Sequence, residues 1–369
     1  MELQILRPKV YLVYEGRLGA GRASSTYVIE NAEVFNHMCE VEIIVSKRPG
    51  WSIPDDLRSR FKIIELGLTF DPKTVIRNIV GHVAFSLAIR RYLISQAGTG
   101  VVIFHGWWPL QLVRFSRRLA REKLIVLEVH DQINFNYIFR KSFFNQIGLF
   151  VATNKFKFEE LLRYYNLKTI LERNAVRSDR YQKIARNVSS KSFTIGYTGT
   201  LGPEKNPKFF LTAVRRLPEI SFKLAGPLDG ELRDNLLRER NVELAGFLKI
   251  EEIPTFQMSC DALLVTLDPQ NETSNLYTST MKLFEYIAAQ CPILAPNLPS
   301  ILDILDESEF YPYEANSIES LIAALRKLRE DISFDQVKLP SQKRIAEYSW
   351  EGRNSRILRK CEEIFESRF

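Results

Sequence analysis

The chain has 369 residues, of which 45% are hydrophobic and 26% are charged, and its formal net charge is +7. This length favours two domains over a single core, and the composition is that of a globular protein rather than a disordered or fibrous one. The basic balance suits an anionic ligand, a nucleic acid or an acidic membrane surface. Because no RNP-type, zinc-finger or basic-zipper pattern occurs, nucleic acid is not expected as a partner.

Cysteines and apolar segments indicate the compartment. The four cysteines are scattered without paired spacing, at Cys39, Cys260, Cys291 and Cys361. They suggest neither a zinc site nor a disulfide framework, so we expect a reducing compartment and no bound metal. Residues 1–15 lack the features of a signal peptide. Residues 79–89 form the most apolar long segment, which is too short to span a bilayer. The expected location is therefore cytoplasmic.

In the first half of the chain, short apolar runs alternate with helical patterns. Strands are expected at 9–14, 41–46, 61–66, 101–104, 124–129, 149–152 and 169–171. Helices are expected at 25–38, 75–95, 110–121 and 155–165. This alternation predicts a parallel sheet with helices on both faces.

The pattern restarts near residue 193. Strands are expected at 193–197, 221–225, 262–266 and 293–295, and helices at 207–217, 232–238, 279–289 and 318–329. Residues 177–191 are polar and poor in large aliphatic side chains, which is typical of a linker. We therefore expect an α/β protein with two Rossmann-like, doubly wound domains, at 1–176 and 192–348. Such domains bind ligands at the carboxyl ends of their strands, in a cleft.

The most informative segment is 278–295 (TSTMKLFEYIAAQCPILA). Thr278 or Ser279 is expected to cap a helix, whose unpaired N–H groups and positive dipole end suit an anion. Lys282 and Glu285 follow on one face of the helix. A phosphate at the helix start and an acidic side chain two turns on would hold a nucleotide by its diphosphate and ribose. The alternative is a solvated Lys–Glu pair above an ordinary core face.

A glycine-containing loop follows the first strand of the second domain (IGYTGTLGPEKNP). Gly199 lets the backbone approach a ligand closely. Asn206 is a natural helix N-cap and Pro207 a natural first helical residue. With the charge of Lys205 at its mouth, the loop fits a phosphate, although a tight turn with a surface lysine fits equally well.

The first strand of the first domain also ends in a glycine-rich loop (EGRLGAGRASS), which includes Gly19 and Gly21. The spacing differs from G-x-G-x-x-G, and no acidic residue ends the next strand, so a classical NAD site is not expected.

Two histidines end strands of the first domain, His105 in VVIFHGWWP and His130 in LIVLEVHDQ. Catalytic groups of such folds sit at these strand ends. A histidine followed by an acid, as in His130-Asp131, can serve as a general base or orient a hydroxyl. A structural role is the alternative. Trp107 and the next tryptophan either line a sugar or lipid site or belong to the core.

Residues 135–150 mix aromatic side chains with Arg140 and Lys141. This composition fits a cover over an acceptor opening, a contact with a membrane surface, or a buried helix of the domain.

Six motifs in order give the sequence a resemblance to a known family. They are NAVR, GTLGPEKNP, FKLAGPLDG, NVELAGFLKIEEIP, TSTMKLFEYIAAQCPI and YSWEGRNSRILRKCEEIF. Together they resemble the GT-B glycosyltransferases, and within these the large retaining family four, also called glycosyl transferases group 1. The likeness covers nearly the whole chain and is strongest from 193 to 366.

The resemblance implies a site for a nucleotide-diphosphate sugar. The residues expected to form it are Gly19, Gly21, Gly199, Lys205, Phe247, Leu248, Thr278, Ser279, Lys282 and Glu285. Lys205 would neutralise the diphosphate, the start of the helix would bind the distal phosphate, and Glu285 would accept hydrogen bonds from the ribose. Phe247 and Leu248 would border the base.

The resemblance also assigns catalytic and acceptor roles. The expected catalytic residues are His105, Lys205 and Glu285, with His105 facing the transferred sugar or the acceptor. Trp107, His130 and Asp131 are the expected acceptor residues. The terminal helix, 349–369, would cross back onto the first domain.

Three positions depart from the family pattern, and at one of them Met281 replaces a common proline. The first of the two usual glutamates falls on Tyr277, which removes a contact to the hydroxyls of the donor sugar. The basic residue that often precedes the loop lysine is Thr200, so diphosphate binding depends more on Lys205 and the helix dipole.

The expected function is that of a retaining glycosyltransferase of the hexosyltransferase type. It would transfer a sugar from a nucleotide-diphosphate donor to a hydroxyl of a glycan or lipid-linked glycan, without a metal or other cofactor. The alternatives are a non-catalytic nucleotide-sugar or glycan-binding protein and a GT-B sugar-nucleotide epimerase. The basic charge and the segment 135–150 are compatible with peripheral contact at the inner face of a membrane.

Overall fold

A computed structural model describes residues 8–68, 75–110, 113, 116–130, 146–186 and 192–367. The chain divides into two compact units. The first joins Met1–Arg173 to Trp350–Phe369, and the second is Asn174–Ser349.

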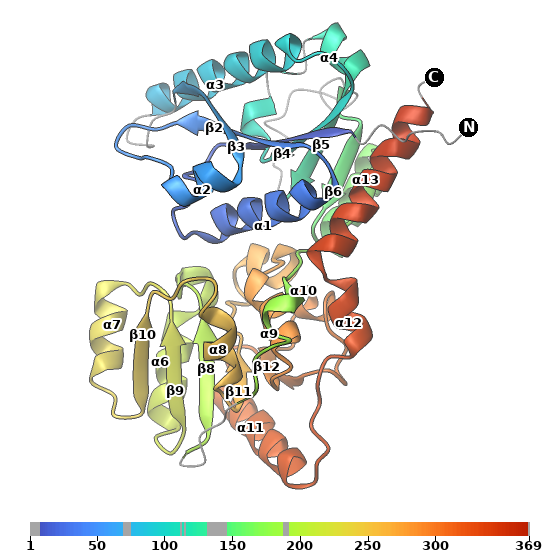
Figure 1. The fold of residues 1–369 in the computed structure, drawn as a ribbon. Coiled ribbons are helices and arrows are strands. Elements are labelled where there is room, and N and C mark those ends of the chain that lie inside the picture. Colours follow the sequence, from blue (N-terminus) through green and yellow to red (C-terminus); the bar gives the residue numbers. More distant parts are fainter. Residues whose placement is uncertain are drawn as a thin grey trace. The chain divides into compact units, whose positions relative to one another are not determined.

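The first unit is built on a seven-stranded parallel sheet of order β3-β2-β1-β4-β5-β6-β7 (Figure 1). Its strands are β1 Lys9–Tyr14, β2 Val41–Lys47, β3 Lys62–Leu68, β4 Gly100–His105, β5 Lys123–Val129, β6 Leu149–Ala152 and β7 Thr169–Leu171. The central strands are mainly apolar and almost wholly buried, as is typical of parallel sheets covered on both faces. The predicted strands of this half are confirmed.

Helices cover both faces of the first sheet. They are α1 Ala23–Met38, α2 Asp55–Arg60, α3 Val75–Ser95, α4 Arg117–Glu122, α5 Lys155–Tyr165 and α13 Trp350–Glu366. Side chains of α3, α4 and α5 form one core with the sheet. On the other side α1 packs against α13, so the predicted return of the terminal helix to the first unit is confirmed. The helix predicted at 110–121 is shorter in the described residues, where Ser116 caps α4 by accepting from Leu119 N.

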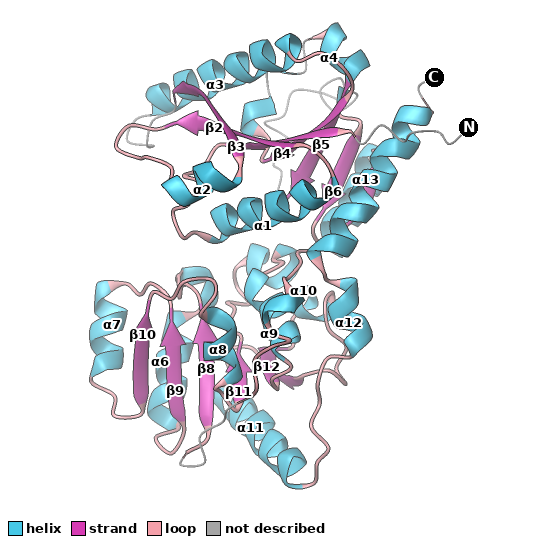
Figure 2. Cartoon of the chain, in the orientation of Figure 1, coloured by secondary structure: helices cyan, strands magenta, loops and turns pink. Residues whose placement is uncertain are grey.

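The second unit holds a six-stranded parallel sheet of order β10-β9-β8-β11-β12-β13 (Figures 1 and 2). Its strands are β8 Thr194–Thr198, β9 Ser221–Ala225, β10 Val242–Gly246, β11 Ala262–Leu264, β12 Ile293–Pro296 and β13 Tyr311–Tyr313. Strands β10 and β13 were not predicted. Both lie at sheet edges, and β10 is only partly buried, so neither leaves a strong apolar run in the sequence.

Two cores flank the second sheet. The helices are α6 Pro207–Arg216, α7 Gly230–Leu237, α8 Ile253–Met258, α9 Met281–Ala289, α10 Pro299–Leu302, α11 Ile318–Ser333 and α12 Gln342–Glu347. One core joins α6, α7 and α11 to the sheet, and the other centres on α9. Asn206 caps α6 by accepting from Phe209 N at 3.2 Å, as predicted.

The segment predicted as a linker differs from that expectation. Its described residues belong to the second unit, where Tyr181 is buried in the core around α9. The Tyr181 hydroxyl donates to Gln257 Oε1 at 2.8 Å. This largely polar segment therefore contributes one buried aromatic side chain to the core of the second unit.

Among the described residues, no helix combines the length and the apolar character that a membrane span requires.

Candidate functional site

The start of α9 lies later in the chain than the sequence predicts. Thr273–Tyr277 form a π-helical turn, and the backbone is then extended at Thr278 and Thr280. The helix begins at Met281, with Thr280 as its N-cap and no side-chain cap. The prediction that Thr278 or Ser279 caps the helix is therefore wrong. The amide of Asn174 donates to the carbonyl oxygen of Ser279, a long-range contact that holds the chain extended here.

Lys282 is the most unusual side chain of this region. It is only 8% exposed, and its Nζ has no hydrogen-bond partner in the described part of the chain. The ammonium lies 3.6 Å from the centroid of the Tyr197 ring, a cation–π contact. Burial, and then the neighbouring charge of Lys205, hold the pKa of Lys282 well below its usual range. The solvated Lys–Glu pair considered above is thus wrong for Lys282, which is a buried cation without a hydrogen-bonded anion.

The loop after β8 approaches this ammonium. Gly199 has φ +101°, and a Cβ added to it would lie 3.5 Å from Lys282 Nζ. Lys205 ends the turn Pro203–Lys205 and is half-buried, and burial lowers its pKa. The structure therefore brings together Gly199, Lys205 and Lys282, all predicted for donor binding. Both lysines therefore lie at the loop that follows β8: Lys205 belongs to this loop, and Lys282 reaches it from α9.

Glu285 lies one turn further along α9 and is half-buried. Its Oε2 accepts a hydrogen bond from Gln257 Nε2 at 3.1 Å, and the same Nε2 also donates to Thr198 Oγ1 at 3.2 Å. Gln257 is fully buried and also accepts from the Tyr181 hydroxyl. Sequence reasoning missed Gln257, because a glutamine in a six-residue helix has no distinguishing spacing. It holds the Glu285 carboxylate in place.

The other predicted donor residues of this unit lie on loops. Phe247 follows β10 and is 67% exposed, so its aromatic ring is open to solvent. Leu248 is half-buried. Tyr277, at the position of the missing glutamate, ends the π-helical turn.

In the first unit, the glycine-rich loop adopts left-handed backbone angles. Gly19 has φ +83° and Gly21 has φ +65°. The Gly19 N–H donates to Ser25 Oγ at 2.7 Å, which ties the loop to the first turn of α1. A Cβ on Gly19 would lie 2.7 Å from Pro54, so glycine is required there. The approach of Gly19 and Gly21 to a diphosphate bound by the other domain stays a prediction, and so does the expected ligand-binding cleft.

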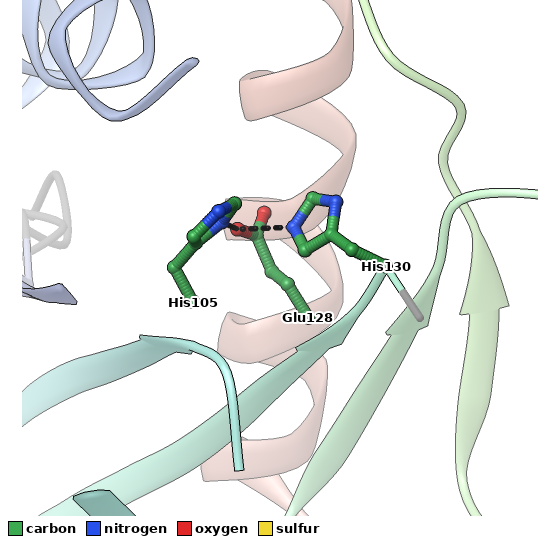
Figure 3. Close-up of side chains that lie close together, drawn as sticks. All are labelled: His105, Glu128 and His130. Atoms are coloured by element: carbon green, nitrogen blue, oxygen red, sulfur yellow. Dashed lines mark ion pairs between the residues drawn. The ribbon is translucent and has the colours of Figure 1, made fainter. Parts of the chain in front are cut away.

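His105 and His130 come together with Glu128 at the carboxyl ends of β4 and β5 (Figure 3). Glu128 Oε2 lies 3.6 Å from His105 Nδ1 and 3.6 Å from His130 Nε2. The two imidazole rings are 4.1 Å apart between centroids. Asp131, which the sequence pairs with His130, lies outside the described residues.

Glu128 is buried and anchors further groups. Its Oε1 accepts from the Tyr27 hydroxyl at 2.8 Å and pairs with Arg353 Nη2 at 2.7 Å. Burial raises the pKa of Glu128, but Arg353 and the histidines outweigh this and hold it well below its usual range. The sequence analysis did not single out Glu128. The available signal was a carboxylate inside the apolar run LIVLEVH, two residues before His130 and thus on the same face of the strand.

The two tryptophans after His105 differ in exposure. Trp107 packs against the core of the first unit, and Trp108 is 43% exposed and stacks on His82 at 5.0 Å between ring centroids. A role of Trp107 toward an acceptor stays a prediction. Residues 135–145, most of the aromatic and basic segment, lie outside the described residues.

Two all-parallel α/β units, with the terminal helix returned to the first, define the GT-B fold. Residues 192–331 match the family model described as "Glycosyl transferases group 1". This match and the fold confirm the resemblance that the motifs indicated, and they support a glycosyltransferase.

Solved structures with the same fold cover nearly the whole chain. Sucrose-phosphate synthase from Thermosynechococcus elongatus has a TM-score of 0.76 and 15% identity, covering 98% of this chain and 100% of that one. Anabaena HepE in complex with UDP and glucose has a TM-score of 0.70 and 13% identity, covering 96% and 100%. S. aureus TarM in complex with fondaparinux, α-GlcNAc-glycerol and UDP has a TM-score of 0.68 and 12% identity, covering 97% and 99%. A search of curated proteins finds no match to this chain.

Proposed function

We propose that the protein is a retaining glycosyltransferase that moves a sugar from a nucleotide-diphosphate donor to a hydroxyl of a glycan or lipid-linked glycan. The observation that carries this proposal is the buried ammonium of Lys282. A charged group in a low-dielectric site is costly unless an opposite charge joins it. A diphosphate bound beside Lys282 and Lys205 would give the Lys282 ammonium the hydrogen-bonded anion that it lacks among the described residues.

The costly event in sugar transfer is departure of the diphosphate, because negative charge develops on it. Lys205, Lys282 and the positive dipole end at the start of α9 would stabilise that charge electrostatically. Because Gly199 has no side chain, a phosphate oxygen can approach its backbone. Two lysine side chains and a helix N-terminus would supply this stabilisation without a metal ion at the diphosphate.

The nucleoside would be held by groups further along the same surface. Glu285, oriented by the buried amide of Gln257, would accept hydrogen bonds from the ribose hydroxyls. The exposed ring of Phe247 would stack on the base. Similar folds support a nucleotide ligand, since HepE is in complex with UDP and TarM is in complex with UDP.

For retention of configuration, the acceptor hydroxyl would attack from the side on which the diphosphate leaves. We assign no carboxylate nucleophile. His105, at the end of β4, would face the transferred sugar or the acceptor, with His130, Asp131 and Trp107 toward the acceptor. The basic charge of the chain fits an acceptor on an anionic, lipid-linked carrier, with peripheral contact at a membrane surface.

The experiment is donor turnover in matched variants of the full chain. Lys205→Ala should lower turnover of nucleotide sugars at least about 100-fold, the size expected when a transition-state charge partner is removed. Glu285→Ala, which removes the acceptor for the ribose hydroxyls, should also lower turnover. Lys208→Ala and Glu251→Ala, which change exposed residues of the same unit, should leave turnover within about twofold. Donors would first be chosen from a thermal-shift panel of nucleotide sugars. Turnover like that of the wild type in both site variants would refute the proposal.

A non-catalytic nucleotide-sugar binding protein is the second candidate, because Tyr277 replaces the usual glutamate. This candidate predicts that nucleotide sugars stabilise the protein but that no free or transferred sugar forms during long incubation. A GT-B epimerase predicts a change of the donor sugar without its release. Product analysis by mass spectrometry and NMR separates the three.

A further inference from the structure

We propose that the first unit carries a binding site for a divalent transition-metal ion, formed by His105, Glu128 and His130. Two imidazoles and one carboxylate are the ligand set that first-row metals such as Zn²⁺ and Co²⁺ accept. All three residues come from the adjacent parallel strands β4 and β5, at or just after their carboxyl ends. This inference goes beyond the proposed function and does not depend on it.

The distances favour an ion between the three groups. Glu128 Oε2 lies 3.6 Å from His105 Nδ1 and 3.6 Å from His130 Nε2, and the three atoms lie within 4.8 Å of one another. These separations exceed a normal N–H···O hydrogen bond. Ligands bonded at about 2.1 Å to one tetrahedral ion lie roughly 3.4 Å apart, so small side-chain shifts complete the geometry.

The side chains point toward one another from two sides. In Figure 3 the imidazoles of His105 and His130 flank the Glu128 carboxylate. His130 Nε2 is buried and, within the described residues, has no hydrogen-bond partner. Its side chain is 21% exposed, and that of His105 is 14% exposed, so both rings reach the surface of the described residues.

Two neighbouring side chains orient the Glu128 carboxylate for metal binding. Tyr27 and Arg353 both bind Oε1, which fixes the carboxylate plane and leaves Oε2 for the imidazoles. Hydrogen-bonded partners of this kind orient ligands in known metal sites.

Arg353 limits how tightly an ion is held. Its charge offsets that of Glu128, so the three ligands and Arg353 together are neutral. We therefore expect reversible binding, weaker than at a structural zinc site with thiolate ligands.

The test is titration of the metal-free full chain with Co²⁺ and Zn²⁺. We expect one equivalent to bind, with visible absorption bands of nitrogen- and oxygen-ligated Co²⁺ that Zn²⁺ displaces. His105→Gln and His130→Gln should each weaken binding at least about tenfold, in line with the loss of one ligand. The chain has four histidines, so His37→Gln and His82→Gln complete the set of controls and should bind like the wild type.

The outcomes separate cleanly. Absence of one-equivalent binding to the wild type, or equal binding by His130→Gln, would overturn the proposal. So would loss of binding in His82→Gln, because that ring pairs with Glu15 and offers a competing site. Thermal melts check that each variant is folded. Since the measurement uses no donor or acceptor, its failure leaves the proposed transferase activity untouched, and the converse also holds.

Discussion

Replacement of the buried Lys282 by methionine should stabilise the protein while it removes donor binding. Methionine is unbranched and of similar length, so it fills the same space beside Tyr197. The wild-type ammonium is 8% exposed and has no hydrogen-bond partner in the described part of the chain. The substitution removes the cost of burying that group and retains contact with the ring.

The magnitude follows from opposing contributions. Burial of a charge without an anionic partner costs several kcal/mol. In the wild type, the cation–π contact at 3.6 Å between Lys282 and Tyr197 offsets about 2 kcal/mol of this burial cost. In the variant, a sulfur–aromatic contact with Tyr197 contributes about 1 kcal/mol instead. The expected net gain is about 1–2 kcal/mol, within the range of single stabilising substitutions. For a unit of this size, that gain raises Tm by about 2–8 °C.

The gain should depend on pH with a defined sign. The pKa of Lys282 is lowered in the folded state, so between that pKa and the unfolded value near 10.4 the unfolded chain binds more protons. Wild-type stability therefore rises with pH across this window. The advantage of Lys282→Met should be larger at pH 6.5 than at pH 9.5.

The assay is chemical and thermal unfolding of the two proteins at both pH values, with nucleotide binding measured by calorimetry. Lys208→Met, on an exposed position of α6, is the matched control and should change neither property. A lower Tm for Lys282→Met at pH 6.5, or unchanged nucleotide affinity, would refute the reasoning.

Two further predictions concern the charged groups of each unit. A diphosphate beside Lys282 should raise the pKa of this lysine, so the protein should take up a proton when UDP binds, and UDP affinity should fall as pH rises from 7.5 to 9.5. Calorimetry in phosphate and Tris buffers measures the proton uptake. A UDP affinity that does not depend on pH would contradict this prediction. Arg353→Met leaves the Glu128 carboxylate buried without its cation and should destabilise the protein by about 3–5 kcal/mol. Glu128→Gln in the same chain should recover much of this loss in urea unfolding, and no recovery would show that Arg353 acts through packing instead.

The sequence determined the architecture of both units. Alternation of short apolar runs with helical patterns was sufficient to predict the first sheet and the four inner strands of the second, because a strand buried on both faces is mainly apolar. The edge strands β10 and β13 were not predicted. Local chemistry also fixed several ends of elements, such as the cap of α6 by Asn206. His105 and His130 could be placed at strand ends for the same reason, since each follows directly on an apolar run.

Only the tertiary structure decided how these groups are used. The helix α9 starts at Met281, after an extended stretch in which the amide of Asn174, far away in the sequence, binds the Ser279 carbonyl. The spacing of Lys282 and Glu285 suits an exposed ion pair equally well, and burial against Tyr197 depends on the packing of β8 on α9. Glu128 and Arg353 are 225 residues apart, so no local pattern links them. Periodicity and capping act over a few residues, whereas burial, charge pairing and side-chain convergence arise when distant segments pack together.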